Sequence, residues 1–257
     1  MILKNLLINI KLLRENLEFD YRRILSGFLI LFVLVFFYFL RIDIVLLSLI
    51  SSFCLYDLYR SKIIHNSTFT FTFVISIILT YLLILNRFIF QDIALIILFI
   101  SSILFSILFR YKKNIFFCLS LIIFLYFFIK INLFHRNLFY FIILTSFLND
   151  TSAYISGKIF KGPLIIPSIS PKKTWSGTSI SIFISTSFIY YFYSNLIFAF
   201  TLSILFFFGD IYFSFIKRIN NIKDFSNLFP GHGGILDRID SMFFTTIIFF
   251  TYTKFLS

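Results

Sequence analysis

The residues best suited to chemistry in this 257-residue chain are charged side chains around a glycine-rich turn near its C-terminal end. The charged residues concerned are Asp210, Lys217, Arg218, Lys223, Asp224, Asp237, Arg238 and Asp240. Between them lies a turn made of Gly231, His232, Gly233 and Gly234. Carboxylates bind Mg²⁺, and lysines and arginines hold phosphate oxygens. Glycines let backbone N–H groups approach an anion closely. The sequence therefore predicts metal-assisted phosphoryl or nucleotidyl transfer.

Helical spacing divides these residues into two groups. Asp210, Ser214, Lys217 and Arg218 fall at i, i+4, i+7 and i+8, which places them on one stripe of a helix. Asp237 and Asp240 are three residues apart and share a face where the next helix opens. Two simpler explanations stay open, because acids stabilise helix N-termini and a histidine between glycines also suits an ordinary turn.

A second polar segment precedes this one. Asn149 and Asp150 stand near the end of an apolar run, where an acid is expected to face the protein interior or water. Lys172 and Lys173 then follow a proline and precede Trp175, the chain's single tryptophan. The two lysines suit a nucleotide phosphate or an anionic lipid headgroup. A basic flank with an interfacial tryptophan would explain them equally well.

The composition is that of a membrane protein. Apolar residues make up 60% of the chain, charged residues only 13%, and the mean hydropathy is +0.98. These values exclude an ordinary soluble domain. Cys54 and Cys118 lie in apolar runs without CxxC spacing, so we read them as small buried hydrophobic residues. We assign no nucleic-acid partner to the excess of basic residues, because it follows the membrane topology described next.

The apolar runs predict an all-α, polytopic membrane protein with about nine transmembrane helices. The expected spans are 24–40, 42–59, 68–86, 92–109, 115–130, 137–156, 178–194, 196–214 and 241–256. A cytoplasmic N-terminus places eighteen of the 23 basic residues on the cytoplasmic side and five on the other, as the positive-inside rule requires. The C-terminus then lies on the opposite side, and loops 157–177 and 215–240 share the cytoplasmic face.

Three regions follow from this organisation. Residues 1–23 have leucines and isoleucines at helical spacing and predict an amphipathic segment on the membrane surface, with a frayed tail as the alternative. Residues 24–136 form the N-terminal membrane helices. Residues 137–257 form the catalytic membrane region with its two polar loops. All four prolines and seven of the eight glycines lie between Gly157 and Gly234, so structured turns are concentrated there.

The polar segments resemble the signature of the phosphatidate cytidylyltransferases, also called CDP-diacylglycerol synthases. Its pattern, Ser-x2-Lys-Arg-x4-Lys-Asp followed by Pro-Gly-His-Gly-Gly-x2-Asp-Arg-x-Asp, is matched at every fixed position from Ser214 to Asp240. The upstream elements Asn-Asp-x-x-Ala-Tyr and Ser-Pro-Lys-Lys-Thr-Trp appear at 149–154 and 170–175. The resemblance covers about 149–241 by motif. Ser176 stands where the family usually has an acid, which puts any role of that acid in doubt for this chain.

The resemblance implies an enzyme that joins CTP to phosphatidic acid, forming CDP-diacylglycerol and pyrophosphate. It also implies Mg²⁺ bound by Asp210 and Asp237, a monovalent cation such as K⁺ beside it, and a homodimer in the bacterial inner membrane. Catalytic duties fall to the charged residues named above and His232. Substrate-binding duties fall to Asn149, Asp150, Lys172, Lys173, Ser214, Gly231, Gly233 and Gly234.

Two other functions are compatible with parts of the pattern. A CTP-dependent polyprenol or phytol kinase would transfer the terminal phosphoryl group of CTP to an alcohol and release CDP. A transporter would need polar residues near the midplane of several helices. The charges of this chain gather toward one face instead, which disfavours a transporter.

Overall fold

The computed structural model describes residues 29, 32–63, 89–108, 113–228 and 233–255. The helices before the polar loops are α2 (Asp43–Arg60), α4 (Ile89–Leu108), α5 (Lys113–Phe134) and α6 (Arg136–Phe160). A hairpin of β1 (Leu164–Ile166) and β2 (Ser170–Thr174) follows. The remaining helices are α7 (Trp175–Tyr193), α8 (Leu196–Ile219), the short α9 (Leu236–Ile239) and α10 (Met242–Phe255).

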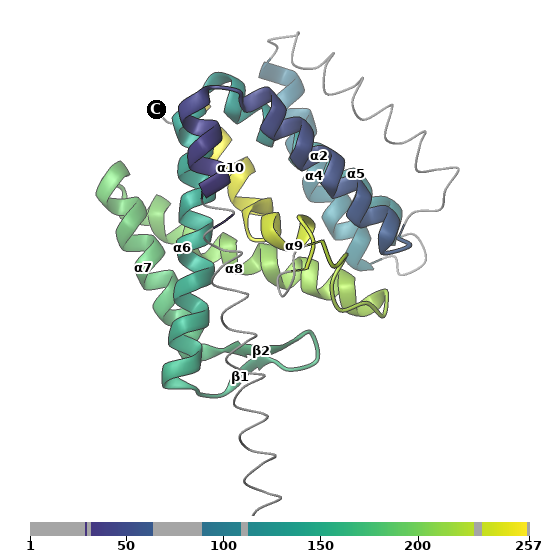
Figure 1. Cartoon of the computed structure of the whole chain (residues 1–257), viewed down its shortest axis with the longest axis vertical. Coiled ribbons are helices and arrows are strands. Elements are labelled where there is room, and N and C mark those ends of the chain that lie inside the picture. Colours follow the sequence, from purple (N-terminus) through teal and green to yellow (C-terminus); the bar gives the residue numbers. More distant parts are fainter. Residues whose placement is uncertain (1–28, 30–31, 64–88, 109–112, 229–232, 256–257) are drawn as a thin grey trace, which may run out of the picture.

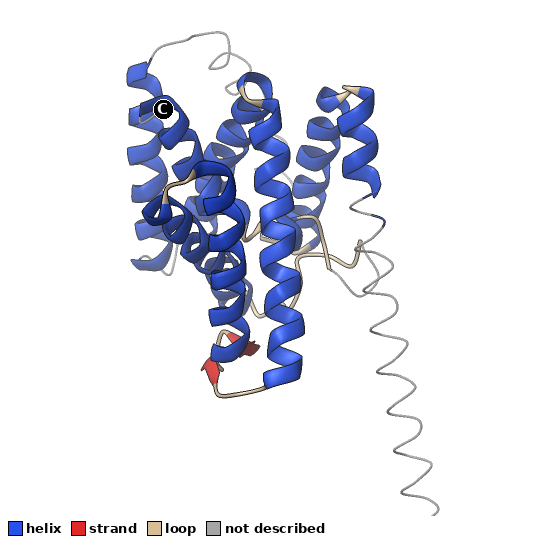
Figure 2. Cartoon of the chain, turned by 90° about the vertical axis from the view of Figure 1, so that its left-hand side faces the viewer, coloured by secondary structure: helices blue, strands red, loops and turns tan. Residues whose placement is uncertain are grey.

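The helices form a bundle with the hairpin at one end, as Figures 1 and 2 show. Among the described residues, three helices are long and apolar enough to cross a membrane, namely α5, α6 and α8. The chain is therefore a mostly helical membrane protein. The expected amphipathic segment 1–23 and the expected span 68–86 lie outside the described residues.

Aromatic side chains join the helices that surround the polar segments. The rings of Phe117, Phe213 and Phe243 are fully buried and come from α5, α8 and α10. The Phe213 ring lies 5.3 Å from that of Phe117 and 5.0 Å from that of Phe243, in edge-to-face arrangements. Such pairs stabilise a core beyond the area that they bury. These contacts fix α8, which carries Ser214, Lys217 and Arg218, against α5 and α10.

The predicted break between the seventh and eighth apolar runs is confirmed. Ser194 takes a left-handed conformation (φ 52°) at the end of α7. Asn195 caps α8, because its side-chain oxygen accepts the backbone N–H of Phe198 at 3.0 Å. Asparagine is among the best N-cap residues. Two polar residues are thus enough to end one helix and start another.

The β-hairpin is a feature that the all-α prediction lacks. β1 and β2 pair antiparallel, with Leu164 opposite Thr174 and Ile166 opposite Ser170. The sequence indicated only a rigid, proline-rich turn here. The hairpin packs against α7 and α8. It therefore brings the first polar segment against the helix that carries the second.

A buried ion pair lies near the C-terminal end of α5. Lys130 of α5 pairs with Asp92 of α4, and both side chains are almost inaccessible to solvent. Tyr126 donates a hydrogen bond to the same carboxylate at 3.1 Å. Because a charge buried without a partner is costly, this pair ties α4 to α5.

Replacing Lys130 with methionine is expected to destabilise the protein. The substitution leaves the Asp92 carboxylate buried without its cation, which costs about 3–5 kcal/mol. Thermal unfolding in detergent measures the loss. The double variant Asp92→Leu/Lys130→Met removes both charges and is expected to regain most of it, and a single variant that melts like the wild type would contradict the assignment.

Candidate active site

An ion pair between Lys217 and Asp237 lies at the centre of the signature segment. The Nζ atom of Lys217, on α8, lies 2.7 Å from Oδ1 of Asp237, on α9. The other oxygen, Oδ2, accepts the backbone N–H groups of Phe225 at 3.1 Å and Gly234 at 2.9 Å. The Lys217 ammonium also lies 5.5 Å from the centre of the Phe225 ring. Asp237 is thus held from three directions.

A second ion pair joins the hairpin to α8. Lys173, on β2, pairs with Oδ2 of Asp210, and Ser214 donates to Oδ1 of the same carboxylate at 3.5 Å. Asp210, Ser214 and Lys217 therefore share one side of α8, as their spacing predicted. The two polar segments, which the sequence placed on one face, are brought together here.

The acids of this cluster outnumber its bases. Asp150, Asp210, Asp237 and Asp240 interact electrostatically with one another and with Lys173, Lys217 and Arg238. The cluster contains four acidic and three basic side chains. We refer to these seven residues as the acid–base cluster. Such a cluster suits a divalent cation together with a phosphate-bearing ligand.

The donor chemistry of the cluster fits Mg²⁺. Asp210 and Asp237 offer carboxylate oxygens, the hard ligands that Mg²⁺ prefers. Among the described residues, no group of three His, Cys, Asp or Glu side chains is placed to hold a metal by itself. Mg²⁺ sites commonly use one or two carboxylates and complete their shell with water and substrate phosphates, so two carboxylates suffice.

Gly209 lets α8 approach the turn before α10. A Cβ at this position would lie 2.4 Å from the backbone oxygen of Asp240 and 2.8 Å from that of Ser241. Any side chain would therefore force α8 away from this turn. The hydroxyls of Ser146 and Ser241, 2.6 Å apart, attach α6 to the same turn. Close helix packing thus places Asp240 beside Asp210.

The surroundings of Asp240 disfavour the negatively charged form of its carboxyl group. Burial, together with the nearby Asp210 carboxylate, raises the pKa of the Asp240 carboxyl well above its ordinary value, although Lys217 offsets part of the effect. The Oδ1 atom of Asp240 accepts the backbone N–H of Ser241 at 2.8 Å. The charged form of Asp240 is therefore less stable here than in water.

Replacing Asp240 with asparagine is expected to stabilise the protein. The amide oxygen can still accept the N–H of Ser241, while the disfavoured charge is removed. Because burial and the Asp210 carboxylate disfavour the charged form of Asp240, the variant is expected to melt at a higher temperature than the wild type at pH values above the raised pKa. The gain shrinks as the pH falls and is absent below the ordinary pKa of aspartate, where both folded and unfolded states are protonated. Thermal unfolding as a function of pH tests this, and a lower melting temperature at pH 8 would contradict it.

Arg218 contacts the hairpin rather than the acid–base cluster. Its Nε donates to the carbonyl oxygen of Ile169 at 3.0 Å, and Nη1 donates to that of Ile222 at 3.3 Å. The guanidinium therefore fastens the turn between β1 and β2 to the end of α8. Although Arg218 follows Lys217 in the sequence, its observed role is to join the two polar segments.

The other predicted site residues lie in varied surroundings. Asn149 is buried and accepts a hydrogen bond from Ser185 at 3.5 Å. Gly233 adopts a φ of +74° beside Asp237. The exposed members are Lys172, Lys223 and Asp224. Gly231 and His232 lie outside the described residues.

Ser176 closes the loop before the hairpin. Its hydroxyl donates to the carbonyl oxygen of Lys161 and lies 3.2 Å from the Thr174 hydroxyl. A carboxylate could not donate that first hydrogen bond. In this chain the position therefore has a role in loop structure.

Asp57 is a residue of the site that the sequence reading missed. It lies on α2, within an expected membrane span, and is fully buried. Its carboxylate accepts hydrogen bonds from Ser226 and from the backbone of Leu236. The available signal was an acid near the end of an apolar run, which is expected to face the protein interior.

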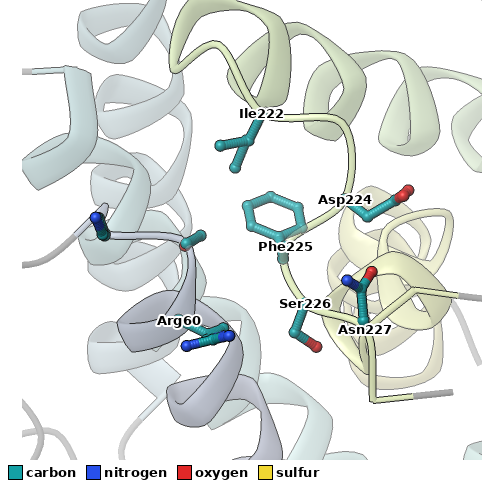
Figure 3. Close-up of a pocket in the computed structure, with 8 residues that line it drawn as sticks. Arg60, Ile222, Asp224, Phe225, Ser226 and Asn227 are labelled. Carbon is teal, nitrogen blue, oxygen red and sulfur yellow. The ribbon is translucent and has the colours of Figure 1, made fainter.

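A pocket of about 310 Å³ opens beside the cluster, between the end of α2 and the segment after α8 (Figure 3). Arg60 and Lys62 line one side, and residues from Ile222 to Asn227 line the other. Phe225 lines this pocket and also contacts Lys217. Its ring therefore separates the pocket from the Lys217–Asp237 pair.

A family model and several known proteins match this chain. The family model described as "Cytidylyltransferase family" matches residues 21–256. A phosphatidate cytidylyltransferase of Rickettsia conorii is 42% identical over 117 residues, covering 39% of this chain and 51% of its own length. That of Rickettsia prowazekii is 40% identical over 127 residues, covering 43% and 55%. The chloroplastic phosphatidate cytidylyltransferase 4 of Arabidopsis thaliana is 42% identical over 115 residues, covering 41% and 29%.

The chain spans about half the length of the Rickettsia relatives that it matches. The family model, in contrast, extends over nearly the whole chain and includes every residue of the acid–base cluster. The chain therefore belongs to the cytidylyltransferase family.

Proposed function

We propose that the protein transfers the cytidylyl group of CTP to phosphatidic acid, forming CDP-diacylglycerol and pyrophosphate. The observation that carries this proposal is the acid–base cluster, in which Lys173 and Lys217 are paired with Asp210 and Asp237. The Rickettsia and Arabidopsis relatives, which are named phosphatidate cytidylyltransferases, support the same reaction.

In this reaction an oxygen of the lipid phosphate attacks the α-phosphorus of CTP. The bond from the α-phosphorus to the bridging oxygen breaks, and pyrophosphate leaves with that oxygen. A phosphate monoester, with a second pKa of about 6, is largely ionised at pH 7 and needs no general base. Lys173, Lys217 and Arg238 hold phosphate oxygens and stabilise the charge that develops during transfer.

Asp210 and Asp237 would hold Mg²⁺, which supplies charge neutralisation on the phosphates when bound. A monovalent cation such as K⁺ is proposed beside it.

The residues assigned to substrate binding are Asn149, Asp150, Lys172, Ser214 and the glycine turn. Arg218, Lys223, Asp224, His232 and Asp240 complete the proposed catalytic set, and Arg218 also holds the hairpin through the carbonyl oxygen of Ile169.

The proposed setting is a bacterial inner membrane. We propose nine spans, a cytoplasmic N-terminus, a C-terminus on the opposite side and an active site open to the cytoplasm. The proposed regions are 1–23 on the membrane surface, 24–136 as N-terminal membrane helices and 137–257 as the catalytic part. A homodimer is proposed as the working form.

Purified protein incubated with CTP, phosphatidic acid and Mg²⁺ tests the proposed reaction. Lipid mass spectrometry is expected to show CDP-diacylglycerol, with pyrophosphate released in equal amount. Chelation of divalent cations is expected to abolish turnover, and added Mg²⁺ to restore it, because the negative charge of the CTP phosphates is no longer neutralised by the metal. Turnover that persists in excess chelator would exclude a required divalent cation, and release of CDP would indicate a lipid kinase instead.

A further inference from the structure

Asp57 joins α2 to two separate parts of the signature segment. Its Oδ1 accepts the hydroxyl of Ser226 at 2.6 Å, and its Oδ2 accepts the backbone N–H of Leu236 at 2.8 Å. These partners lie 169 and 179 positions later in the chain. Both oxygens of one buried carboxylate are thus used to fix a remote segment.

Each of these contacts lies beside a group that holds Asp237. Ser226 follows Phe225, whose N–H donates to Oδ2 of Asp237. Leu236 directly precedes Asp237 and lies two residues after Gly234, whose N–H donates to the same oxygen. Asp57 therefore fixes the backbone on both sides of the Asp237 carboxylate.

The fit between Asp57 and this backbone is close. A Cβ at Gly234 would lie 2.1 Å from Oδ2 of Asp57 and 2.7 Å from its Oδ1. The carboxylate thus occupies the space that any side chain at this position would need. Gly234 allows Asp57 to reach Leu236 and Ser226 at the same time.

Figure 3 shows the pocket between the end of α2 and the segment that carries Ser226. The end of α2, which carries Arg60, faces the segment from Ile222 to Asn227 across the open pocket, and Asp224 points away from α2. A leucine at position 57 would fill space at lower cost than a buried carboxylate. The acid provides two directed hydrogen bonds to the segment, which a leucine cannot provide.

We propose that Asp57 is a positioning residue for the transfer reaction, which acts by holding Ser226 and Leu236 so that the Asp237 carboxylate keeps its orientation. The expected effect of Asp57 on turnover rests on the proposed function. The structural part of the inference concerns the order of residues 224–228 and 233–240 and is independent of that function.

Two substitutions of Asp57 separate positioning from space filling. In Asp57→Asn, the amide oxygen can accept the N–H of Leu236 while the amide nitrogen donates to the Ser226 hydroxyl. This variant is expected to keep kcat within about threefold of the wild type. Asp57→Leu loses both contacts, and its kcat is expected to fall by roughly 10–100-fold, with a higher Mg²⁺ concentration needed for half-maximal rate.

Hydrogen–deuterium exchange provides a readout that does not depend on activity. Amides in peptides covering 224–240 are expected to exchange faster in Asp57→Leu than in the wild type, and at the wild-type rate in Asp57→Asn. Asp92→Asn is the matched control, because it alters another buried acid that contacts Lys130 instead of the signature segment. It is expected to lower the melting temperature without changing exchange in 224–240 or kcat.

Equal exchange of 224–240 in Asp57→Leu and Asp92→Asn would overturn the proposal. If Asp57→Leu does not fold, Ser226→Ala gives the same comparison, because it removes one of the two contacts and is expected to speed the same exchange. Absence of CDP-diacylglycerol from the wild type would refute the proposed function alone, and the exchange data would still decide whether Asp57 holds this segment.

Discussion

Replacing Asp237 with asparagine is expected to lower kcat by roughly 100–1,000-fold while leaving the protein in the membrane. The carboxylate is paired with Lys217 at 2.7 Å and is a proposed Mg²⁺ ligand. Loss of one such ligand removes several kcal/mol of transition-state stabilisation, and about 1.4 kcal/mol corresponds to a factor of ten in rate. Steady-state turnover of CTP and phosphatidic acid, at saturating Mg²⁺, measures the effect.

Asp92→Asn is the control for this substitution. It also neutralises a buried acid, but one that pairs with Lys130. Its kcat, corrected for the folded fraction, is expected to match the wild type. Near-normal turnover by Asp237→Asn would show that this carboxylate holds neither Mg²⁺ nor substrate.

Replacing Lys217 with methionine is expected to reduce both activity and stability. The side chain is almost fully buried and faces Asp237, so its loss leaves a buried carboxylate without a cation. Breaking such a pair costs about 3–5 kcal/mol of folding free energy. The loss of a phosphate-binding charge is expected to lower kcat by about 100-fold. Thermal unfolding and turnover are measured on the same preparation.

Lys113→Met is the matched control for Lys217→Met. Lys113 contacts the end of the same helix, where its Nζ donates to the carbonyl oxygen of Ile219 at 3.0 Å. Its loss is expected to lower the melting temperature modestly and to leave kcat within about twofold of the wild type. Equal kcat losses in the two variants would mean that Lys217 acts on the fold rather than on the reaction.

Much of the candidate site could be predicted because its parts are close in sequence. The spacing of Asp210, Ser214 and Lys217 placed them on one stripe of a helix, and the structure places them on one side of α8. Local geometry decides such a prediction. The break at Ser194 and Asn195 was predictable for the same reason, because these two residues end one helix and cap the next.

The parts that were missed depend on contacts between distant residues. The local sequence of Asp57 is that of an acid at the end of a membrane span, and nothing near it names Ser226 or Leu236 as its partners. Lys173 was predicted to bind substrate, with a basic membrane flank as the alternative, but its pairing with Asp210 was not predicted because it requires the hairpin to fold against α8. For Arg218, the helical spacing predicted a place beside Lys217. In the structure its side chain instead donates a hydrogen bond to the carbonyl oxygen of Ile169 in the hairpin.

Parallel incubations with CTP labelled at the α- or the γ-phosphorus test the central claim most directly. Cytidylyl transfer predicts that the α-label enters CDP-diacylglycerol and the γ-label leaves as pyrophosphate. Both results should require Mg²⁺ and should be largely lost in Asp237→Asn. Entry of the γ-label into lipid, or no labelled lipid at all from folded wild-type protein, would contradict the account.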